Sequence, residues 1–220
     1  FRLNKNEIIG ILGPNGCGKT TTIGMILGLL KPTSGKILIN GIEIEKNRVQ
    51  LLNNLNFISP YIELPKKLTV KQNLIVYGKL YDIKDLKKKI EYLSEKLRLG
   101  DIINKLTGEL SSGQKNRVSL AKSIINDPLV LLLDEPTASL DPETGDFVRS
   151  FFESYQKEKG TSILLASHNM SEVERLCSSV LMMNNGSIID QGSPEKLIQK
   201  HGRKNMEEVF LKLTRENYEF

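Results

Sequence analysis

The clearest chemical signal in the sequence is a glycine-rich segment at residues 13–20, which reads Gly-Pro-Asn-Gly-Cys-Gly-Lys-Thr. It fits the pattern G-x-x-x-x-G-K-[ST], and it follows an apolar run and opens a helical pattern, as a phosphate-binding loop requires. Glycines let successive backbone N–H groups converge on phosphate oxygens, and the helix start adds partial positive charge. The expected nucleotide-binding residues are Gly13, Pro14, Asn15, Gly16, Cys17, Gly18, Lys19, Thr20 and Thr21.

Three side chains of this segment have more specific interpretations. Lys19 supplies a positive charge for the β- and γ-phosphates, and Thr20 offers a hydroxyl to Mg²⁺, the expected cofactor. Cys17 is interpreted as a spacer within the loop. Because it lies at a helix start, where thiols become reactive, a reactive Cys17 is the alternative.

A second candidate group follows the longest purely apolar run, Leu129–Leu133. Asp134 and Glu135 come directly after this predicted strand. Ligands of parallel sheets sit at the carboxyl ends of the strands, so both carboxylates are expected beside the nucleotide. We expect Asp134 to bind Mg²⁺ and Glu135 to orient or deprotonate the attacking water.

The elements that must position these groups alternate between strand and helix. Strands are predicted at Glu7–Leu12, Ile37–Ile39, Ile42–Ile44, Leu55–Ser59, Leu129–Leu133, Ser162–Ala166, Val180–Met183 and Ser187–Gln191. Helices are predicted at Thr20–Leu30, Val70–Tyr81, Leu86–Leu99, Gln114–Ile125, Glu143–Lys159 and Ser171–Cys177. Apolar strands separated by helices indicate an α/β fold with a mainly parallel sheet covered on both faces. A turn at Asn40-Gly41 adds a small antiparallel part, and residues 66–125 form an all-helical insert.

Composition restricts the class of protein. The chain has 220 residues, 39% of them hydrophobic and 26% charged, which is typical of a globular domain and not of a disordered or fibrous chain. No apolar segment approaches the ~20 residues of a membrane-spanning helix, and no secretory signal is visible. The two cysteines, Cys17 and Cys177, make no disulfide framework, which favours a reducing cytosol.

Positive charge is concentrated in the middle of the chain. Residues 66–115 contain 12 basic and 6 acidic side chains, whereas the whole chain has a net charge of +5. Such a segment suits anionic lipid, acidic partner loops or nucleic acid. The alternative is a solvated helix face.

Further segments resemble the ABC-type ATPase family, over a stretch from Phe1 to about Gly192. Its signature motif is matched by Leu110, Ser111, Ser112, Gly113 and Gln114, its D-loop by Ser139, Leu140 and Asp141, and its switch histidine by His168. The resemblance implies a P-loop NTPase core in which His168 contacts the γ-phosphate and acts in catalysis with Glu135. It also implies that two such domains pair head to tail, with ATP between the phosphate loop of one and the signature of the other.

The sequence departs from the family pattern at three places. The adenine-stacking aromatic residue is expected upstream of Phe1, so the domain is expected to be truncated at its N-terminus. Ser112 stands where the signature usually has glycine. The glutamine between the first lobe and the helical insert is also missing: its place falls at Ser59-Pro60, and Ser59 or Glu63 is expected to substitute.

The resemblance implies one ABC ATPase domain over residues 1–220, with a helical subdomain at 66–125 and a C-terminal helical tail at 193–220. It implies a cytoplasmic ATPase on the inner face of the cell membrane, paired as a homodimer or with another ABC ATPase. It also implies a separate transmembrane permease as partner, and residues 207–214 resemble the tail of bacterial exporter subunits. No nucleic acid partner is expected.

Two other classes of ABC ATPase remain as alternatives. The chromosome-maintenance type carries a long coiled coil between phosphate loop and signature, and too few residues separate Lys19 from Leu110 for one. The translation type has two such domains in one chain, and this chain has one.

Overall fold

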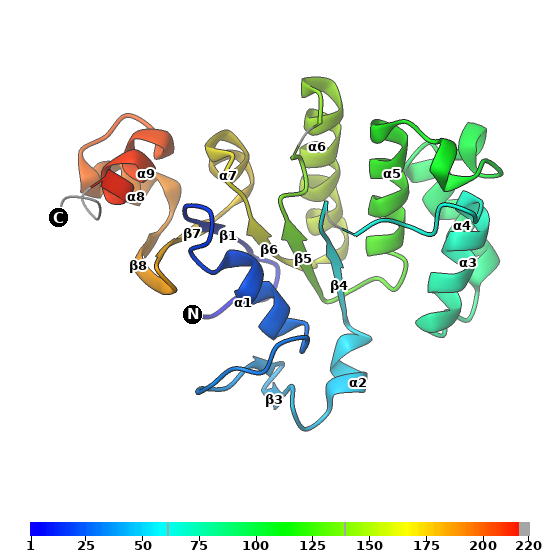
Figure 1. Cartoon of the computed structure of the whole chain (residues 1–220), viewed down its shortest axis with the longest axis horizontal. Helices are drawn as coiled ribbons and strands as arrows, with labels where there is room; N and C mark the ends of the chain where they lie inside the picture. Colours follow the sequence, from blue (N-terminus) through cyan, green and yellow to red (C-terminus); the bar gives the residue numbers. More distant parts are fainter. Residues whose placement is uncertain (61, 139, 216–220) are drawn as a thin grey trace.

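A twisted, mainly parallel sheet forms the centre of the molecule (Figure 1). The computed structural model describes residues 1–60, 62–138 and 140–215. Within these residues, six strands pair in the order β4-β5-β6-β1-β7-β8. They are β1 (Ile8–Leu12), β4 (Leu55–Ile58), β5 (Val130–Asp134), β6 (Ser162–Ala166), β7 (Ser179–Asn184) and β8 (Ser187–Gly192). Only the pairing of β8 with β7 is antiparallel in this sheet. A separate hairpin joins β2 (Leu38–Ile39) to β3 (Ile42–Glu43), as the Asn40-Gly41 turn predicts.

Alternate residues of β1 face opposite layers of helices. Ile9 and Ile11 pack with Ile23 of α1 (Lys19–Ile26) on one face of the sheet. Ile8 and Leu12 belong to the larger core on the other face. That core is built with α5 (Ser112–Ser123), α6 (Pro142–Lys159) and α7 (Met170–Leu176). The phosphate-loop helix therefore lies on the opposite face of the sheet from α5.

The predicted helical range at 66–125 contains α3 (Val70–Leu80), α4 (Leu86–Lys96), 3₁₀ turns at Gly100–Ile102 and Thr107–Glu109, and α5. The helix α3 begins at a capping box in which Thr69 Oγ1 accepts from the Gln72 backbone N–H and Gln72 Oε1 accepts from the Thr69 N–H. The helix α3 packs on both α4 and α5. The assignment of residues 66–125 to a separate helical subdomain stays a prediction.

Several element boundaries differ from the prediction. The first helix ends at Ile26 and not at Leu30, because Gly28 turns the chain with φ = 65°. The helix α4 ends at Lys96, two residues before Arg98 takes a positive φ of 51°. A short helix α2 (Arg48–Leu52) was not predicted. In the predicted tail at 193–220, α8 (Pro194–His201) and α9 (Met206–Arg215) are helical, and residues 216–220 lie outside the described part.

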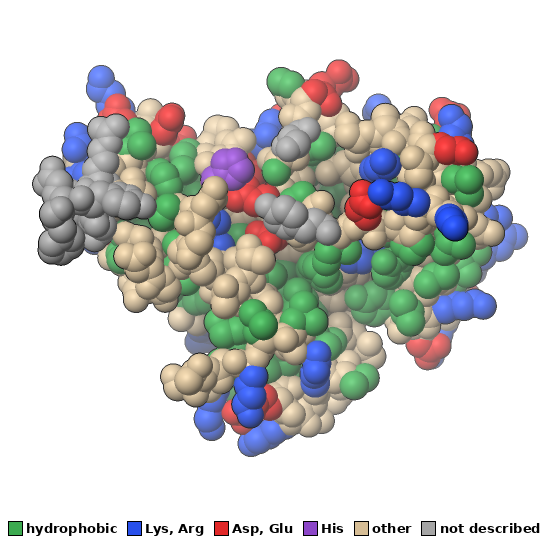
Figure 2. All heavy atoms as spheres, in the orientation of Figure 1, with side chains coloured by type: hydrophobic (Ala, Val, Ile, Leu, Met, Phe, Trp, Pro, Cys, Tyr) green, Lys and Arg blue, Asp and Glu red, His purple; other side chains and the backbone are tan. Residues whose placement is uncertain are grey.

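The basic excess of the middle segment is partly paired. Lys89 forms an ion pair with Asp127 at 2.7 Å, and Lys96 pairs with Glu158 of α6. Figure 2 shows that basic side chains on the side of α3 and α4 are interspersed with acidic, apolar and uncharged ones. The two ion pairs connect α4 to the loop between α5 and β5 and to α6.

In the described part of the chain, none of the helices has the length and apolarity needed to cross a bilayer.

Candidate nucleotide site

The predicted phosphate loop joins β1 to α1 at the carboxyl end of β1. Gly16 and Gly18 have φ values of 79° and 111°, which side-chain-bearing residues rarely adopt. Gly13 has no room for a side chain, since a Cβ there would lie 2.3 Å from the Met183 carbonyl oxygen and 2.4 Å from Cys17 Sγ. The β7 strand end is thus held directly against the loop.

The Lys19 side chain lies within this loop. Its ammonium group donates to the Gly13 carbonyl oxygen at 2.6 Å and to the Pro14 carbonyl oxygen at 3.2 Å, and the residue is buried. The Cys17 side chain is also buried, at 3% exposure, beneath Gly13. This burial fits the spacer interpretation of Cys17 and opposes a reactive, exposed thiol. By contrast, Asn15, Gly16, Thr20 and Thr21 are exposed.

The structure brings Thr20 and Asp134 together. Thr20 Oγ1 donates to Asp134 Oδ2 at 3.1 Å, joining the start of α1 to the end of β5. Burial raises the pKa of the Asp134 carboxyl, against the opposing effect of the Thr20 hydrogen bond. A buried carboxylate beside a hydroxyl is an oxygen ligand pair of the kind that Mg²⁺ prefers.

Glu135 and His168 are also neighbours. His168 Nδ1 lies 2.6 Å from Glu135 Oε2, and the His168 backbone N–H donates to the same oxygen at 3.4 Å. Glu135 has a positive φ of 52°, and its N–H donates to the carbonyl oxygen of Ala166 at 2.8 Å. The end of β6 therefore fixes the backbone of Glu135, while the loop after β6 carries its partner histidine.

The predicted signature segment starts α5. Ser111 Oγ accepts from the Gln114 N–H at 3.3 Å, and Gln114 Oε1 accepts from the Ser111 N–H at 3.0 Å. This capping box uses both side chains, and it leaves Ser112 and Gly113 in the first turn while Leu110 is buried. The helix that it starts, α5, and the phosphate-loop helix α1 cover opposite faces of the sheet.

The predicted D-loop leads into α6. Asp141 caps that helix, accepting from the backbone N–H of Thr144 at 3.0 Å and from its hydroxyl at 2.7 Å. These hydrogen bonds hold the pKa of Asp141 below its usual range. Leu140 is half-buried, and Ser139 lies outside the described residues.

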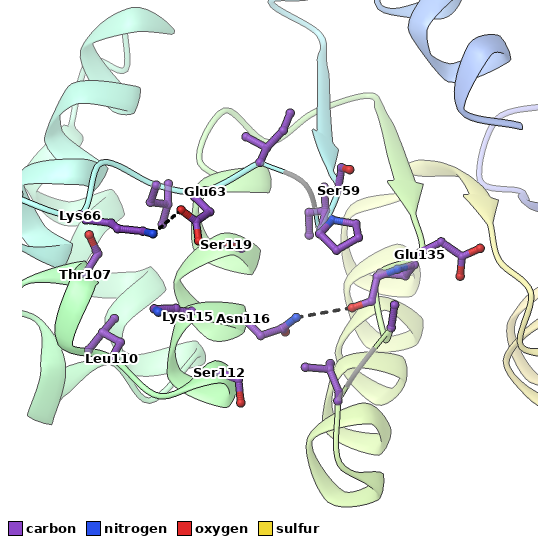
Figure 3. A pocket seen from close by; sticks show the side chains of 17 residues that line it. Ser59, Glu63, Lys66, Thr107, Leu110, Ser112, Lys115, Asn116, Ser119 and Glu135 are labelled. Atoms are coloured by element: carbon purple, nitrogen blue, oxygen red, sulfur yellow. Dashed lines mark hydrogen bonds and ion pairs between the residues drawn. The ribbon is translucent and has the colours of Figure 1, made fainter.

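A cavity of about 330 Å³ separates the end of β4 from α5 (Figure 3). The residues that line it come from the end of β4 and the chain after it, from α5 and its approach, and from the loop after β5: Ile58, Ser59, Pro60, Ile62, Glu63, Leu64, Lys66, Thr107, Leu110, Ser112, Lys115, Asn116, Ser119, Glu135, Pro136, Ala138 and Leu140. Glu63 is directed toward Lys66, with which it forms an ion pair at 2.7 Å, whereas Ser59 lies on the Glu135 side. Of the two predicted substitutes for the missing glutamine, Ser59 is the better placed.

Comparisons with known proteins identify the family of the chain. The model of a family described as "ABC transporter" matches residues 1–138. The chain belongs to the ABC transporter family. It is an ATP-binding and ATP-hydrolysing subunit, and the predicted P-loop NTPase fold is confirmed.

The chain is similar over most of its length to named ATP-binding subunits of transporters. The ABC transporter ATP-binding protein NatA of Bacillus subtilis is 35% identical over 212 residues, covering 95% of this chain and 86% of that protein. The bacitracin transport ATP-binding protein BcrA of Bacillus licheniformis is 36% identical over 94% of this chain and 67% of its own length. A solved ATP-binding subunit of an ABC transporter superposes with a TM-score of 0.88 at 27% identity, over 97% of this chain and 90% of that one.

Sequence reasoning missed two polar residues of this ABC ATPase. Asn116 of α5 donates to the carbonyl oxygen of Pro136, next to Glu135, at 3.4 Å (Figure 3). Glu172 of α7 is completely buried. One feature of the sequence could have indicated that Glu172 is buried: it precedes Val173, a core residue, on a helix that covers the sheet.

Proposed function

We propose that this ATPase powers export through a separate transmembrane permease, working as a head-to-tail pair in the cytoplasm against the inner face of the cell membrane. The observation that carries the proposal is the convergence of Thr20, Asp134, Glu135 and His168 at the carboxyl ends of adjacent strands, beside the phosphate loop. The relatives named above, one of them a bacitracin transport protein, support the transport role.

The site residues divide into phosphate, metal and water functions. Lys19 exchanges its loop carbonyl partners for the β- and γ-phosphates of ATP. Thr20 and Asp134 fit Mg²⁺ because they form an adjacent hydroxyl–carboxylate pair. In the described part of the chain no three His, Cys, Asp or Glu residues cluster as metal ligands. Phosphate oxygens of the nucleotide would therefore complete the coordination, and Mg²⁺ would neutralise charge on the transferring phosphoryl group.

Glu135 and His168 form the proposed catalytic pair. Glu135 takes the proton of the attacking water. The His168 side chain is 64% exposed and that of Glu135 only 14%, so the imidazole has room for a γ-phosphate beside it. His168 orients the carboxylate through Nδ1 and has a second ring nitrogen for the phosphate. The contact thereby links Glu135, which activates water, to His168, which contacts the γ-phosphate.

The signature helix supports the dimeric part of the proposal. The start of α5 is a second anion-binding helix terminus, and it lies on the other face of the sheet from α1. Two chains related head to tail present Ser111 to Gln114 of one to the ATP of the other. Leu140 and Asp141 lie at the start of α6 and are the proposed D-loop residues at this junction.

The test is Glu135→Gln, with Glu143→Gln as a matched control because Glu143 is an exposed acid on α6. Glu135→Gln should bind ATP, hydrolyse it at least about 10²-fold more slowly, and form an ATP-dependent dimer in size-exclusion chromatography. Hydrolysis at the parent rate would refute the catalytic assignment, and an ATP-loaded monomer would refute the dimer. Co-purification of the tagged subunit from membranes, with identification of a multi-span partner, tests the permease.

A further inference from the structure

Glu172 connects the two loops that carry the proposed catalytic pair. Its Oε1 accepts a hydrogen bond from the Thr137 hydroxyl at 3.0 Å, and its Oε2 accepts one from the Ser167 hydroxyl at 2.6 Å. Thr137 follows Glu135 by two residues in the loop after β5, and Ser167 directly precedes His168 in the loop after β6. One side chain of α7 thus bridges the segments on either side of the Glu135–His168 contact.

The bridge begins where the strand pairing ends. The strands β5 and β6 pair in register up to Asp134 and Ala166, and the Glu135 N–H adds a last bond to the Ala166 carbonyl oxygen. Beyond this point the β5–β6 register ends, and the Ser167 N–H donates to the Ile11 carbonyl oxygen of β1 at 3.3 Å instead of to the segment after β5. The carboxylate of Glu172 supplies the next cross-connection.

The local network favours two acceptor oxygens at this position. Ser167 Oγ already accepts from the Asn169 N–H at 3.0 Å, so its proton is directed to Glu172. Asn169 also caps α7 by accepting from the Glu172 N–H at 3.3 Å. Burial raises the pKa of Glu172, which the Ser167 and Thr137 hydroxyls counter. A carboxylate satisfies both hydroxyl donors, whereas an amide has one acceptor and one donor group.

We propose that Glu172 is a positioning residue for ATP hydrolysis, which sets the separation of Glu135 and His168 by holding Thr137 and Ser167. The inference rests on the proposed catalytic pair. Glu172 does not touch substrate; it acts through the two hydroxyls. Its loss should slow turnover because misplacement of reacting groups by about 1 Å can cost ~10²-fold in rate.

The experiment compares Glu172→Gln, Thr137→Val and Ser167→Ala with Glu174→Gln. Glu174 is the matched control, because it is an exposed acid on the same helix that accepts from the Met206 N–H, away from the bridge. Steady-state hydrolysis, nucleotide titration and thermal unfolding are measured for each. The three bridge variants should lower kcat by about tenfold or more and leave nucleotide Kd within about twofold, and Glu174→Gln should match the parent.

A double variant separates positioning from general stabilisation. Thr137→Val combined with Glu172→Gln should be no slower than the slower single variant, since both remove the same connection. Folded bridge variants that keep the parent kcat would overturn the proposal, as would equal losses of kcat and nucleotide affinity that follow thermal stability. If Glu135→Gln hydrolyses ATP at the parent rate, the catalytic assignment is wrong and the role proposed for Glu172 is overturned with it. If Glu135→Gln is slow but the folded bridge variants keep the parent kcat, only the role of Glu172 is overturned.

Discussion

The imidazole Nδ1 of His168 and the carboxylate Oε2 of Glu135 lie 2.6 Å apart, although the residues are 33 positions apart in the chain. The carboxylate proposed to act on water is therefore held by the histidine. Because one oxygen of Glu135 is engaged, the direction of the carboxylate depends on the position of the imidazole. A γ-phosphate that hydrogen-bonds to the imidazole and moves it would therefore also change the direction of the Glu135 carboxylate.

Replacing His168 by alanine should leave nucleotide affinity near the parent value and slow hydrolysis by roughly 10²-fold, because the carboxylate loses its orienting partner. Single-turnover hydrolysis and nucleotide titration measure the two effects. His201→Gln is the control, since His201 pairs with Asp190 on the C-terminal side of the sheet. A His168→Ala variant that turns over like the parent would exclude His168 from catalysis.

Lys19→Ala should lower ATP affinity at least about tenfold, or ~1.4 kcal/mol, by removing the charge from the phosphate loop. The same change frees the carbonyl groups of Gly13 and Pro14 from their ammonium donor. Lys31→Ala is the control, because Lys31 lies beyond α1 with its side chain 82% exposed. Unchanged affinity in a folded Lys19→Ala protein would contradict the loop assignment.

The missing glutamine leads to a prediction at Ser59 and Pro60, which line the same cavity as Glu135. We expect slow basal hydrolysis, with kcat under about 1 s⁻¹. Pro60→Gln, or Ser59→Gln, should accelerate it by adding an amide that orients water and, for Pro60→Gln, by relaxing a stiff loop.

Single-turnover hydrolysis at saturating Mg²⁺ and ATP compares both variants with the parent. The control is Lys67→Gln, since Lys67 is an exposed residue of the same connection that is not among the cavity-lining residues. A fast parent that neither substitution improves would show that another group fills the role.

Because of Lys122, the free energy of unfolding should depend on pH in the alkaline range. Its ammonium group donates to the Phe57 carbonyl oxygen at 3.0 Å, but burial lowers the pKa of Lys122 to about 8. Between pH 8 and 10.5 the unfolded chain binds more protons at this residue than the folded chain, so its contribution to the free energy of unfolding rises with pH.

The difference in unfolding free energy between the parent and Lys122→Met should therefore move in favour of the parent by about 3 kcal/mol across this range. Urea unfolding at several pH values measures it, and Lys115→Met, an exposed lysine of the same helix, should show no such change. A constant difference for Lys122→Met would disprove the shift.

Local patterns predicted most elements of the fold. The strand Ser162–Ala166 and the hairpin turn at Asn40-Gly41 are found as predicted, because apolar runs and turn residues encode them directly. The short helix α2 was missed because five residues are too few to show helical periodicity. The end of α1 was misplaced because nothing in the sequence showed that Gly28, and not Pro32, stops the helix.

The site was predictable as a set of residues but not as a set of contacts. The apolar strand before them identified Asp134 and Glu135, and the family resemblance identified His168. The Glu135–His168 pairing, however, depends on β5 and β6 being adjacent, which the sequence does not state. Glu172 was missed because a glutamate in a short amphipathic helix normally faces water. Its burial follows only from the meeting of the Thr137 and Ser167 loops.

The position of β1 in the sheet has a consequence for synthesis of the protein. Ile8 pairs with Ile163 and Ile9 with Ser179, so the strand that precedes the phosphate loop is translated well before both of its neighbours in the sheet. At ~5–20 residues per second, the apolar Ile8–Leu12 segment waits on the order of ten seconds for β6 and β7 to leave the ribosome. Throughout that interval the apolar strand lacks both pairing partners, and ATP cannot stabilise it because the strands that carry Asp134 and His168 into the site are not yet in place.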